Sequence, residues 1–198
     1  MTEDAVRGVS RETSDQLLQL VQKWNTKINL VAPSTLSQFH DKHIVDAIDL
    51  VACAQAGGKW LDLGSGGGFP GLVVAALDGG VRDVTLIESD RRKCAFLATA
   101  RRELGLTCNI LKTRIEDAEF QNASVISARA LASLPKLLAL STPHVADNGE
   151  LLFLKGRNWR DEDVEARRSW EYDLEVIDGT GNHGSVILRI RNARRTGR

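Results

Sequence analysis

The sequence has little cysteine, no excess charge of either sign and no long apolar run. Its three cysteines, at positions 53, 94 and 108, form no Cys-x-x-Cys pair, so we expect free thiols rather than a zinc site or a disulfide framework. Basic and acidic residues balance at 26 each, which indicates no bulk attraction to nucleic acid. No stretch approaches the roughly 18–20 apolar residues of a membrane span, and the first residues, Met-Thr-Glu-Asp, do not begin a signal region. These absences predict a cytoplasmic protein without membrane or metal partners.

The basic residues are unevenly distributed. Arginine outnumbers lysine 18 to 8, and five of the last ten residues are arginines, namely Arg189, Arg191, Arg194, Arg195 and Arg198. Arginine grips phosphate at two points, so this bias is compatible with an RNA substrate. A solvated charged tail explains the C-terminal cluster equally well.

Two helical segments are predicted at the beginning of the chain. Ser10 starts a helix whose apolar positions recur at helical spacing from Leu17 to Ile28. A second helical stretch covers 35–54, and Gly57-Gly58 ends it. Two helices alone bury too little apolar surface to fold independently. We therefore expect residues 1–56 to form an N-terminal helical extension of the domain formed by residues 57–198.

From Lys59 onward the pattern alternates between strands and helices. Apolar runs lie at 60–63, 84–87, 108–111, 125–127 and 151–154, with helical stretches near 70–78, 90–104, 115–119 and 132–142. Such alternation predicts a parallel sheet with helices on both faces. The last two runs, 172–178 and 185–191, are separated by a turn too short for a parallel crossover, so they should form an antiparallel hairpin. The fold class is therefore α/β, with a mostly parallel seven-stranded sheet.

A glycine-rich loop follows the first predicted strand. Five glycines lie within the eight residues 64–71, and glycine lets a ligand approach backbone N–H groups that a side chain would obstruct. Gly64-x-Gly66-x-Gly68 is typical of a methyltransferase loop, whereas Gly66-x-Gly68-x-x-Gly71 satisfies the dinucleotide fingerprint. The loop, with Gly66 in both patterns, therefore predicts binding of either S-adenosylmethionine or a dinucleotide.

Two features favour the methyltransferase interpretation. The dinucleotide fingerprint normally begins at the strand end, but here it begins two residues late and leaves Asp62 and Gly64 unexplained. The terminal hairpin is also foreign to the dinucleotide-binding fold. Glu88 ends the second strand, where its carboxylate is expected to accept both ribose hydroxyls of the cofactor; an N-cap role for the next helix is the alternative. We therefore predict S-adenosylmethionine as the cofactor.

Six segments carry a resemblance to one family. They are Trp24-Asn-Thr-Lys-Ile-Asn-Leu30, His43-Ile-Val-Asp46, Leu61-Asp-Leu-Gly-Ser-Gly-Gly-Gly-Phe-Pro-Gly71, Thr113-Arg-Ile-Glu116, Ser127-Ala-Arg-Ala130 and Leu154-Lys-Gly156. They resemble the RsmG (GidB) family of rRNA methyltransferases, and the resemblance extends over nearly the whole chain. The resemblance implies a class I, Rossmann-like fold and N7-methylation of one guanine in 16S rRNA. It implies as partner the small ribosomal subunit, its rRNA or an assembly intermediate.

The same resemblance implies roles for individual residues. Gly64 and Phe69 would contact the cofactor around the first loop, and Ile115 and Glu116 would contact its adenine. Arg129 would lie beside both cofactor and substrate. A helix-starting acidic pair remains an alternative for the segment that contains Glu116.

The chemistry of the implied target agrees with the residues present. Guanine N7 carries a lone pair and has no proton to remove, so holding N7 in line with the methyl group supplies much of the rate, and no general base is expected. Arg129 and Lys155 follow the fourth and fifth strands, at the edge where ligands bind in open α/β sheets. As donors they are predicted to hold guanine O6 or backbone phosphates, with internal ion pairs as the alternative.

Further RNA contacts are expected outside the sheet. The resemblance implies that Asn25, Asn29 and His43 lie near the mouth of the site, although a structural role within the extension is the alternative. Arg91 and Arg92 begin the helix after Glu88, where positive charge opposes the helix dipole, and this placement suggests phosphate contact, with solvated surface residues as the equal alternative. Three other functions stay open: methylation of a small molecule or protein, dinucleotide-dependent oxidoreduction, and catalytically silent RNA binding.

Overall fold

A computed structural model of the chain describes residues 9–181 and 184–197. Residues 1–8, 182–183 and Arg198 lie outside the described residues. The prediction that the first residues do not begin a signal region concerns this part of the chain, and so does the last arginine of the C-terminal cluster. Cys53, Cys94 and Cys108 are free thiols, as expected. Every helix of the described ranges is too short or too polar to span a lipid bilayer.

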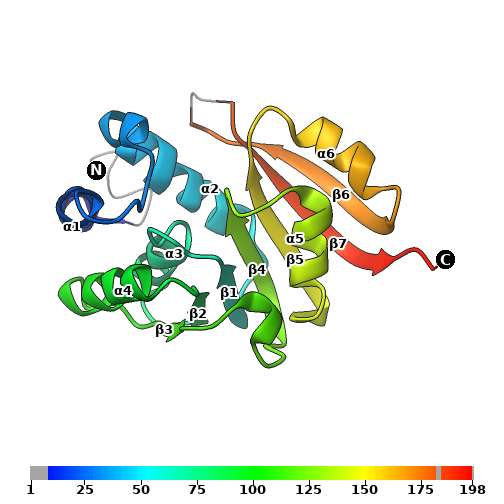
Figure 1. The fold of residues 1–198 in the computed structure, drawn as a ribbon, viewed down its shortest axis with the longest axis horizontal. Helices are drawn as coiled ribbons and strands as arrows, with labels where there is room; N and C mark the ends of the chain where they lie inside the picture. Colours follow the sequence, from blue (N-terminus) through cyan, green and yellow to red (C-terminus); the bar gives the residue numbers. More distant parts are fainter. Residues whose placement is uncertain (1–8, 182–183, 198) are drawn as a thin grey trace.

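The centre of the molecule is a seven-stranded sheet in the order β3-β2-β1-β4-β5-β7-β6 (Figure 1). Its strands are β1 (Lys59–Leu63), β2 (Asp83–Ile87), β3 (Asn109–Leu111), β4 (Ala123–Arg129), β5 (Val145–Lys155), β6 (Trp170–Asp178) and β7 (Val186–Arg195). The first five strands pair in parallel, and β7 pairs antiparallel with both β5 and β6. The predicted α/β fold with a terminal hairpin is confirmed.

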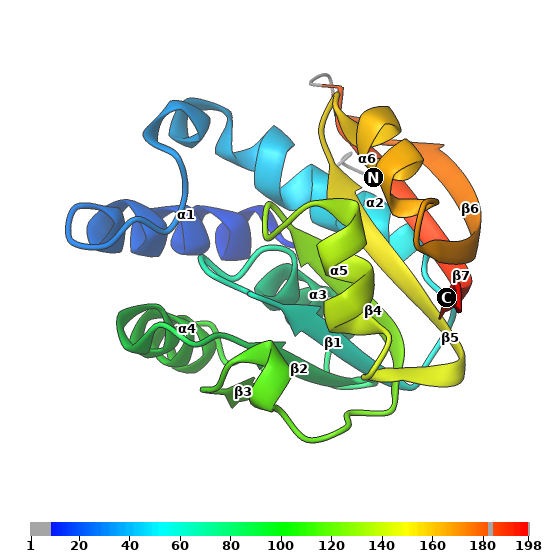
Figure 2. The same cartoon turned by 45° about the vertical axis from the view of Figure 1, so that its right-hand side comes forward.

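The helices that connect the strands cover both faces of the sheet. They are α3 (Gly71–Asp78), α4 (Arg91–Glu103), the short 3-10 helix η4 (Ile115–Asp117), α5 (Leu134–Ser141) and α6 (Trp159–Ala166). Side chains alternate along the strands, so that Trp60 packs toward α3 and α4 while its neighbour Leu61 packs toward α5. Figure 2 shows α5 and α6 on the side of the sheet opposite α3 and α4. The helix α6 was not predicted, because its short, mostly charged sequence carries little helical apolar periodicity.

The N-terminal extension consists of α1 (Arg11–Asn25), the 3-10 helix η2 (Pro33–Gln38), the π-helix η3 (His40–Val45) and α2 (Asp46–Cys53). Ser10 caps α1 by accepting the backbone N–H of Thr13, which confirms the predicted start. The predicted single helix over 35–54 is wrong, since three helices of different pitch occupy this stretch. Leu17, Leu50 and Trp60 belong to one buried cluster, so the extension shares its core with the sheet.

Asn25 explains why the first helix ends before Ile28. Its carboxamide oxygen accepts the backbone N–H groups of Leu30 and Val31 at 2.8 and 3.1 Å, and its Nδ2 donates to the Val31 carbonyl. These bonds fold residues 26–31 into a loop, and Ile28 is buried in that loop rather than on a helix. Asn25 therefore has a structural role within the extension.

The C-terminal arginines belong to the sheet rather than to a tail. β7 continues to Arg195, where it pairs with Trp170 of β6. Arg194 forms an ion pair with Glu171 at 2.6 Å, and Arg189 and Arg191 both reach the buried carboxylate of Glu150. Arg189, Arg191 and Arg194 therefore neutralise acidic side chains of the protein itself, and Arg195 lies over the ring of Trp170.

Candidate active site

A buried series of hydrogen bonds between β1 and β4 anchors the glycine loop. Trp60 Nε1 donates to Ser127 Oγ at 2.9 Å, and Ser127 Oγ donates to Asp62 Oδ1 at 2.7 Å. Asp62 Oδ2 accepts the backbone N–H of Gly71, the first residue of α3, where a Cβ would approach that oxygen to 2.7 Å. Burial raises the pKa of Asp62 to about 6, against the opposing effect of these hydrogen bonds. The Asp62 carboxylate thus fixes α3 relative to β1 and explains why residue 71 is glycine.

Glu88 holds the glycine loop from the side. Its Oε2 accepts the backbone N–H of Gly66 at 2.9 Å, and its Oε1 accepts that of Asp90 at 2.8 Å. Asp90, not Glu88, caps the following helix, with its Oδ1 accepting the N–H groups of Arg92 and Lys93. Each Glu88 oxygen retains a second lone pair, and the residue lines a cavity beside the loop. The carboxylate can therefore accept ligand hydroxyls while it keeps the loop in place.

That cavity, called the first cavity below, has a volume of about 350 Å³. It lies at the carboxyl ends of the parallel strands, and four of the predicted cofactor residues line it: Gly64, Glu88, Ile115 and Glu116. Gly64 has a φ of +60°, and a Cβ there would lie 2.5 Å from Leu131 Cδ1, so only glycine fits without displacement. The buried His144 bonds the Ile115 carbonyl through Nε2 at 3.1 Å. His144, which no sequence motif indicated, therefore positions one wall of the cavity.

Three other predicted cofactor residues lie apart from this wall. Gly66 is bound to Glu88 through its N–H, next to the cavity. Phe69 lies under the extension, with its ring 5.3 Å from Phe39 and 4.8 Å from His43 between centroids. Arg129 lines a second, neighbouring cavity. The Phe69 cluster fastens the extension to the end of the glycine loop.

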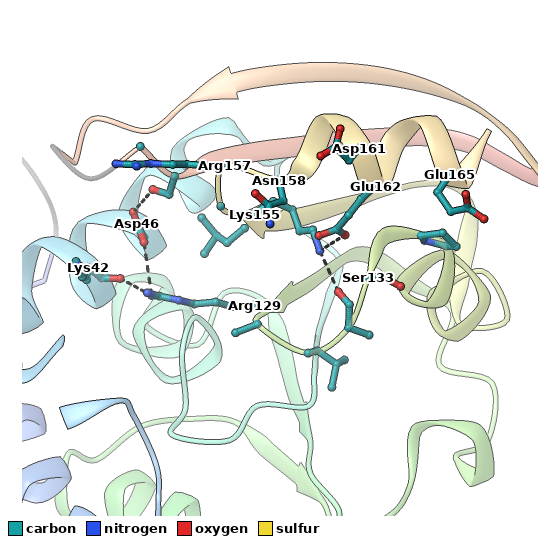
Figure 3. A pocket seen from close by; sticks show the side chains of 18 of the residues that line it. Lys42, Asp46, Arg129, Ser133, Lys155, Arg157, Asn158, Asp161, Glu162 and Glu165 are labelled. Atoms are coloured by element: carbon teal, nitrogen blue, oxygen red, sulfur yellow. Dashed lines mark hydrogen bonds and ion pairs between the residues drawn. The ribbon is translucent and has the colours of Figure 1, made fainter. Parts of the chain in front are cut away.

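The second cavity has a volume of about 1070 Å³ and is formed by segments far apart in the sequence (Figure 3). Its walls are formed by the elements η2, η3 and α2 of the extension, by the ends of β4 and β5, by α6 and by residues 184–185. Both predicted substrate-positioning residues, Arg129 and Lys155, line it. Residues 130–132 line both cavities, so the two meet along this segment.

Arg129 connects β4 to the extension. Its guanidinium donates to the Lys42 carbonyl and lies 3.5 Å from Asp46 Oδ2, while Asp46 Oδ1 accepts the Ser185 hydroxyl at 2.9 Å. Burial lowers the pKa of Arg129 and the Asp46 carboxylate opposes that effect. Asp46 ends the His-Ile-Val-Asp motif, so the sequence contained a signal for it although no role was predicted. This contact joins the extension, the sheet and the hairpin at one edge of the second cavity.

Lys155 is held by a carboxylate that the sequence did not indicate. Its Nζ lies 2.5 Å from Glu162 Oε2 and donates to the Ala132 carbonyl at 2.9 Å. Glu162 Oε2 also accepts the backbone N–H of Leu134 at 2.7 Å, at the start of α5. The ion pair weighed as an alternative is therefore present, and the pair lies on the cavity wall.

The predicted RNA contacts differ in position. Asn29, Arg91 and Arg92 are exposed, whereas His43 is buried, with its Nε2 3.1 Å from Thr35 Oγ1. Arg91 and Arg92 lie on α4 outside both cavities, and Arg92 approaches Asp90 at 3.6 Å. Only Lys155 of this set lines the second cavity.

A seven-stranded sheet of this order, with a ligand-sized cavity at the carboxyl ends of its parallel strands, defines a class I, Rossmann-like methyltransferase. Solved structures agree on the fold: a SAM-dependent methyltransferase from Aquifex aeolicus has a TM-score of 0.61 at 15% identity, covering 87% of this chain and 97% of that one. The ribosomal protein L11 methylase of Lactobacillus delbrueckii subsp. bulgaricus has a TM-score of 0.58 at 18% identity, covering 74% and 76%.

The family follows from closer relatives. The family described as rRNA small subunit methyltransferase G matches residues 10–181, and the chain belongs to it. A protein named ribosomal RNA small subunit methyltransferase G from Ruegeria sp. is 44% identical over 193 residues, covering 94% of each chain. One of the same name from Jannaschia sp. is 46% identical over 192 residues, covering 93% of this chain and 91% of that one. The predicted family resemblance is confirmed.

Proposed function

We propose that this enzyme transfers the methyl group of S-adenosylmethionine to N7 of one guanine in 16S rRNA of the small ribosomal subunit. The observation that carries the proposal is the pair of cavities that meet along residues 130–132. A cofactor in the first cavity and a base in the second would present their reacting atoms to one another across this segment. Its relatives' name, which specifies small-subunit rRNA, supports the choice of substrate.

The residues of the first cavity fit S-adenosylmethionine. Glu88 offers carboxylate lone pairs for the two ribose hydroxyls, and a carboxylate is the strong acceptor for such donors. Ile115 and Glu116 would flank the adenine, and the absence of a Cβ at Gly64 keeps Leu131 in place on the shared wall. The sulfonium of the bound cofactor supplies an activated methyl group.

The second cavity would act by positioning. Guanine N7 would form its bond to the methyl carbon with its own lone pair while the carbon–sulfur bond breaks and the thioether product leaves, so no protein group would have to remove a proton, and alignment is the main requirement. Arg129, tied to Lys42 and Asp46, and Lys155, tied to Glu162, are held at the cavity wall. Such fixed donors suit contact with guanine O6 or with phosphates of a nucleotide splayed from its stack.

Contacts outside the cavities would supply affinity for the RNA backbone. The exposed Asn29, Arg91 and Arg92 are our candidates, since sequence-independent phosphate contacts contribute much of protein–RNA affinity. His43 would act indirectly, because it contacts both Phe69 of the glycine loop and Thr35 of the extension. These phosphate contacts can be tested with purified protein, because its binding to RNA should weaken steeply as the salt concentration rises.

The decisive experiment maps N7-methylguanine in 16S rRNA from cells with the gene, without it, and with an Arg129→Ala copy. We expect one guanine to lose its methyl group in the second and third strains only. An unchanged map would overturn the proposal. Purified enzyme offered naked rRNA, assembly intermediates and finished subunits with labelled cofactor then identifies which form accepts the methyl group.

A further inference from the structure

The Lys155–Glu162 pair presents a hydrogen-bond donor beside an acceptor on the wall of the second cavity (Figure 3). Within the described ranges, the bonds that hold Glu162 all use Oε2, which contacts Lys155 Nζ at 2.5 Å and Leu134 N at 2.7 Å. The second oxygen, Oε1, keeps its lone pairs for another donor. The side chains of Lys155 and Glu162 are 9% and 26% exposed, so the pair is largely fixed by the protein yet still reachable.

Guanine has the complementary pattern along one edge. Its O6 is an acceptor, and the neighbouring N1–H and N2–H₂ groups are donors; adenine reverses the order of its first two groups, with an amino donor beside the N1 acceptor. An ionised carboxylate only accepts, so it pairs with the donors of guanine and repels the N1 lone pair of adenine. Flipped bases are commonly recognised by hydrogen bonds to this Watson–Crick edge.

We propose that Glu162 is the residue that selects guanine, accepting hydrogen bonds from its N1–H and N2–H₂ edge while Lys155 donates to O6. The inference rests on the proposed function, and adds to it the group that recognises the base. N7 and N2 lie on opposite sides of guanine. Glu162 lines the second cavity but not the first, so a base whose N7 faces the shared segment 130–132 can direct its N2 toward α6.

The other carboxylates of the cavity are less suited to this role. Asp46 is bound to Arg129 and Ser185. Asp161 and Glu165, on the same helix as Glu162, are both exposed, and Glu165 is paired with Arg168 at 2.7 Å. Glu162, by contrast, is joined to a lysine, and this pair presents the donor–acceptor sequence that the edge of guanine requires.

The test uses purified full-length enzyme and 16S rRNA, in the form that accepts the methyl group, with guanine or inosine at the target position. Inosine keeps N7, O6 and N1–H and lacks only the N2 amino group. For the natural enzyme we expect kcat/KM on guanine to exceed that on inosine by about 10- to 100-fold, as expected for a hydrogen bond to a charged group. In Glu162→Ala, which removes both acceptor oxygens, this ratio should fall to nearly one, and in Glu162→Gln, which keeps one neutral amide oxygen, it should be intermediate. Glu165→Ala, the matched control on the same helix, should keep the natural ratio.

The ratio separates recognition from stability. A purely structural role for Glu162 would lower both rates together and leave the ratio unchanged, and that result would overturn the inference alone. A natural enzyme that treats guanine and inosine alike would overturn it too. If the natural enzyme transfers no methyl group to guanine-containing rRNA, the proposed function fails and the inference fails with it. Calorimetry should find unchanged S-adenosylmethionine affinity in Glu162→Gln, because the residue lies outside the first cavity.

Discussion

The two cavities are built in different ways. The first is lined by the turns that follow successive parallel strands, and its shape depends on backbone conformation, as at Gly64, and on Glu88, which accepts two backbone N–H groups. The second is assembled from the extension, β4, β5, α6 and the end of the hairpin, and charged side chains hold these parts together. The first cavity is therefore formed by the edge of the sheet, whereas the second depends on contacts between segments far apart in the sequence.

Because the two cavities are built differently, we expect changes in the second cavity to lower activity without loss of cofactor binding. Arg129→Ala removes the guanidinium that joins β4 to Lys42 and Asp46, and we expect kcat/KM on rRNA to fall about 100- to 1000-fold, since misplaced substrate costs at least two orders of magnitude. Cofactor affinity measured by calorimetry should change little. Asp46→Asn, which keeps the size of the partner, is the companion variant and should lose less. Weakened cofactor binding in Arg129→Ala would mean that the two cavities are not separable.

The reciprocal change lies in the first cavity. Glu88→Ala removes the carboxylate that supports Gly66 and is proposed to accept the ribose hydroxyls, so the cofactor Kd should rise about 100-fold, the effect of losing two bonds to a charged group. RNA affinity, measured without cofactor by filter binding at fixed salt, should be unchanged. Glu88→Gln retains one acceptor oxygen, so its cofactor Kd should lie between those of the natural protein and Glu88→Ala. Unchanged cofactor affinity would remove Glu88 from the ribose site.

The contrast between the cavities also explains what could be predicted from the sequence. The strands, their parallel orientation and the first cavity follow from local patterns: apolar runs, a glycine loop and an acid at a strand end, each recognisable within a few residues. Glu88 and Gly64 were therefore found from sequence alone, and both line the first cavity. The hairpin was predicted for the same reason, because a short connection permits only antiparallel pairing.

The second cavity resisted prediction because its contacts join residues far apart in the chain. Arg129 and Lys155 were identified from their positions after strands, but their partners Asp46 and Glu162 depend on how η3 and α6 pack, which no local pattern records. The helix types of 33–53 were missed for a related reason: apolar spacing marks a helix without specifying its pitch. Phe69 belongs to a specific motif, yet its ring packs on Phe39 and His43, a contact visible only in three dimensions.

A smaller effect, on the pH dependence of stability, is expected from Asp62, the buried acid that anchors the glycine loop. Asp62 has a pKa of about 6 in the folded protein, raised by burial from the ordinary 3.8. Between about pH 4 and 6 the folded protein keeps a proton that the unfolded chain has released, so Asp62 lowers stability progressively as pH rises through this window. The full difference corresponds to at most about 3 kcal/mol above pH 6. Urea unfolding of Asp62→Asn and the natural protein, compared from pH 4 to 7, should show a gap in unfolding free energy that changes in this window. A gap independent of pH would contradict the raised pKa.

The smallest effect is expected for the C-terminal arginines of β7. Their clustering in the sequence is compatible with RNA binding, but in the fold Arg194 pairs with an acidic side chain. Arg194 lies on β7, its ion pair with Glu171 is exposed on both sides, and neither residue lines either cavity. Arg194→Ala should therefore lower the unfolding free energy by less than about 1 kcal/mol, the usual contribution of a surface ion pair. Its rate of rRNA methylation should match that of the natural enzyme at low and high salt. A several-fold drop in rate that grows at low salt would instead put β7 in contact with the RNA backbone, and the substrate surface would then extend well beyond the second cavity.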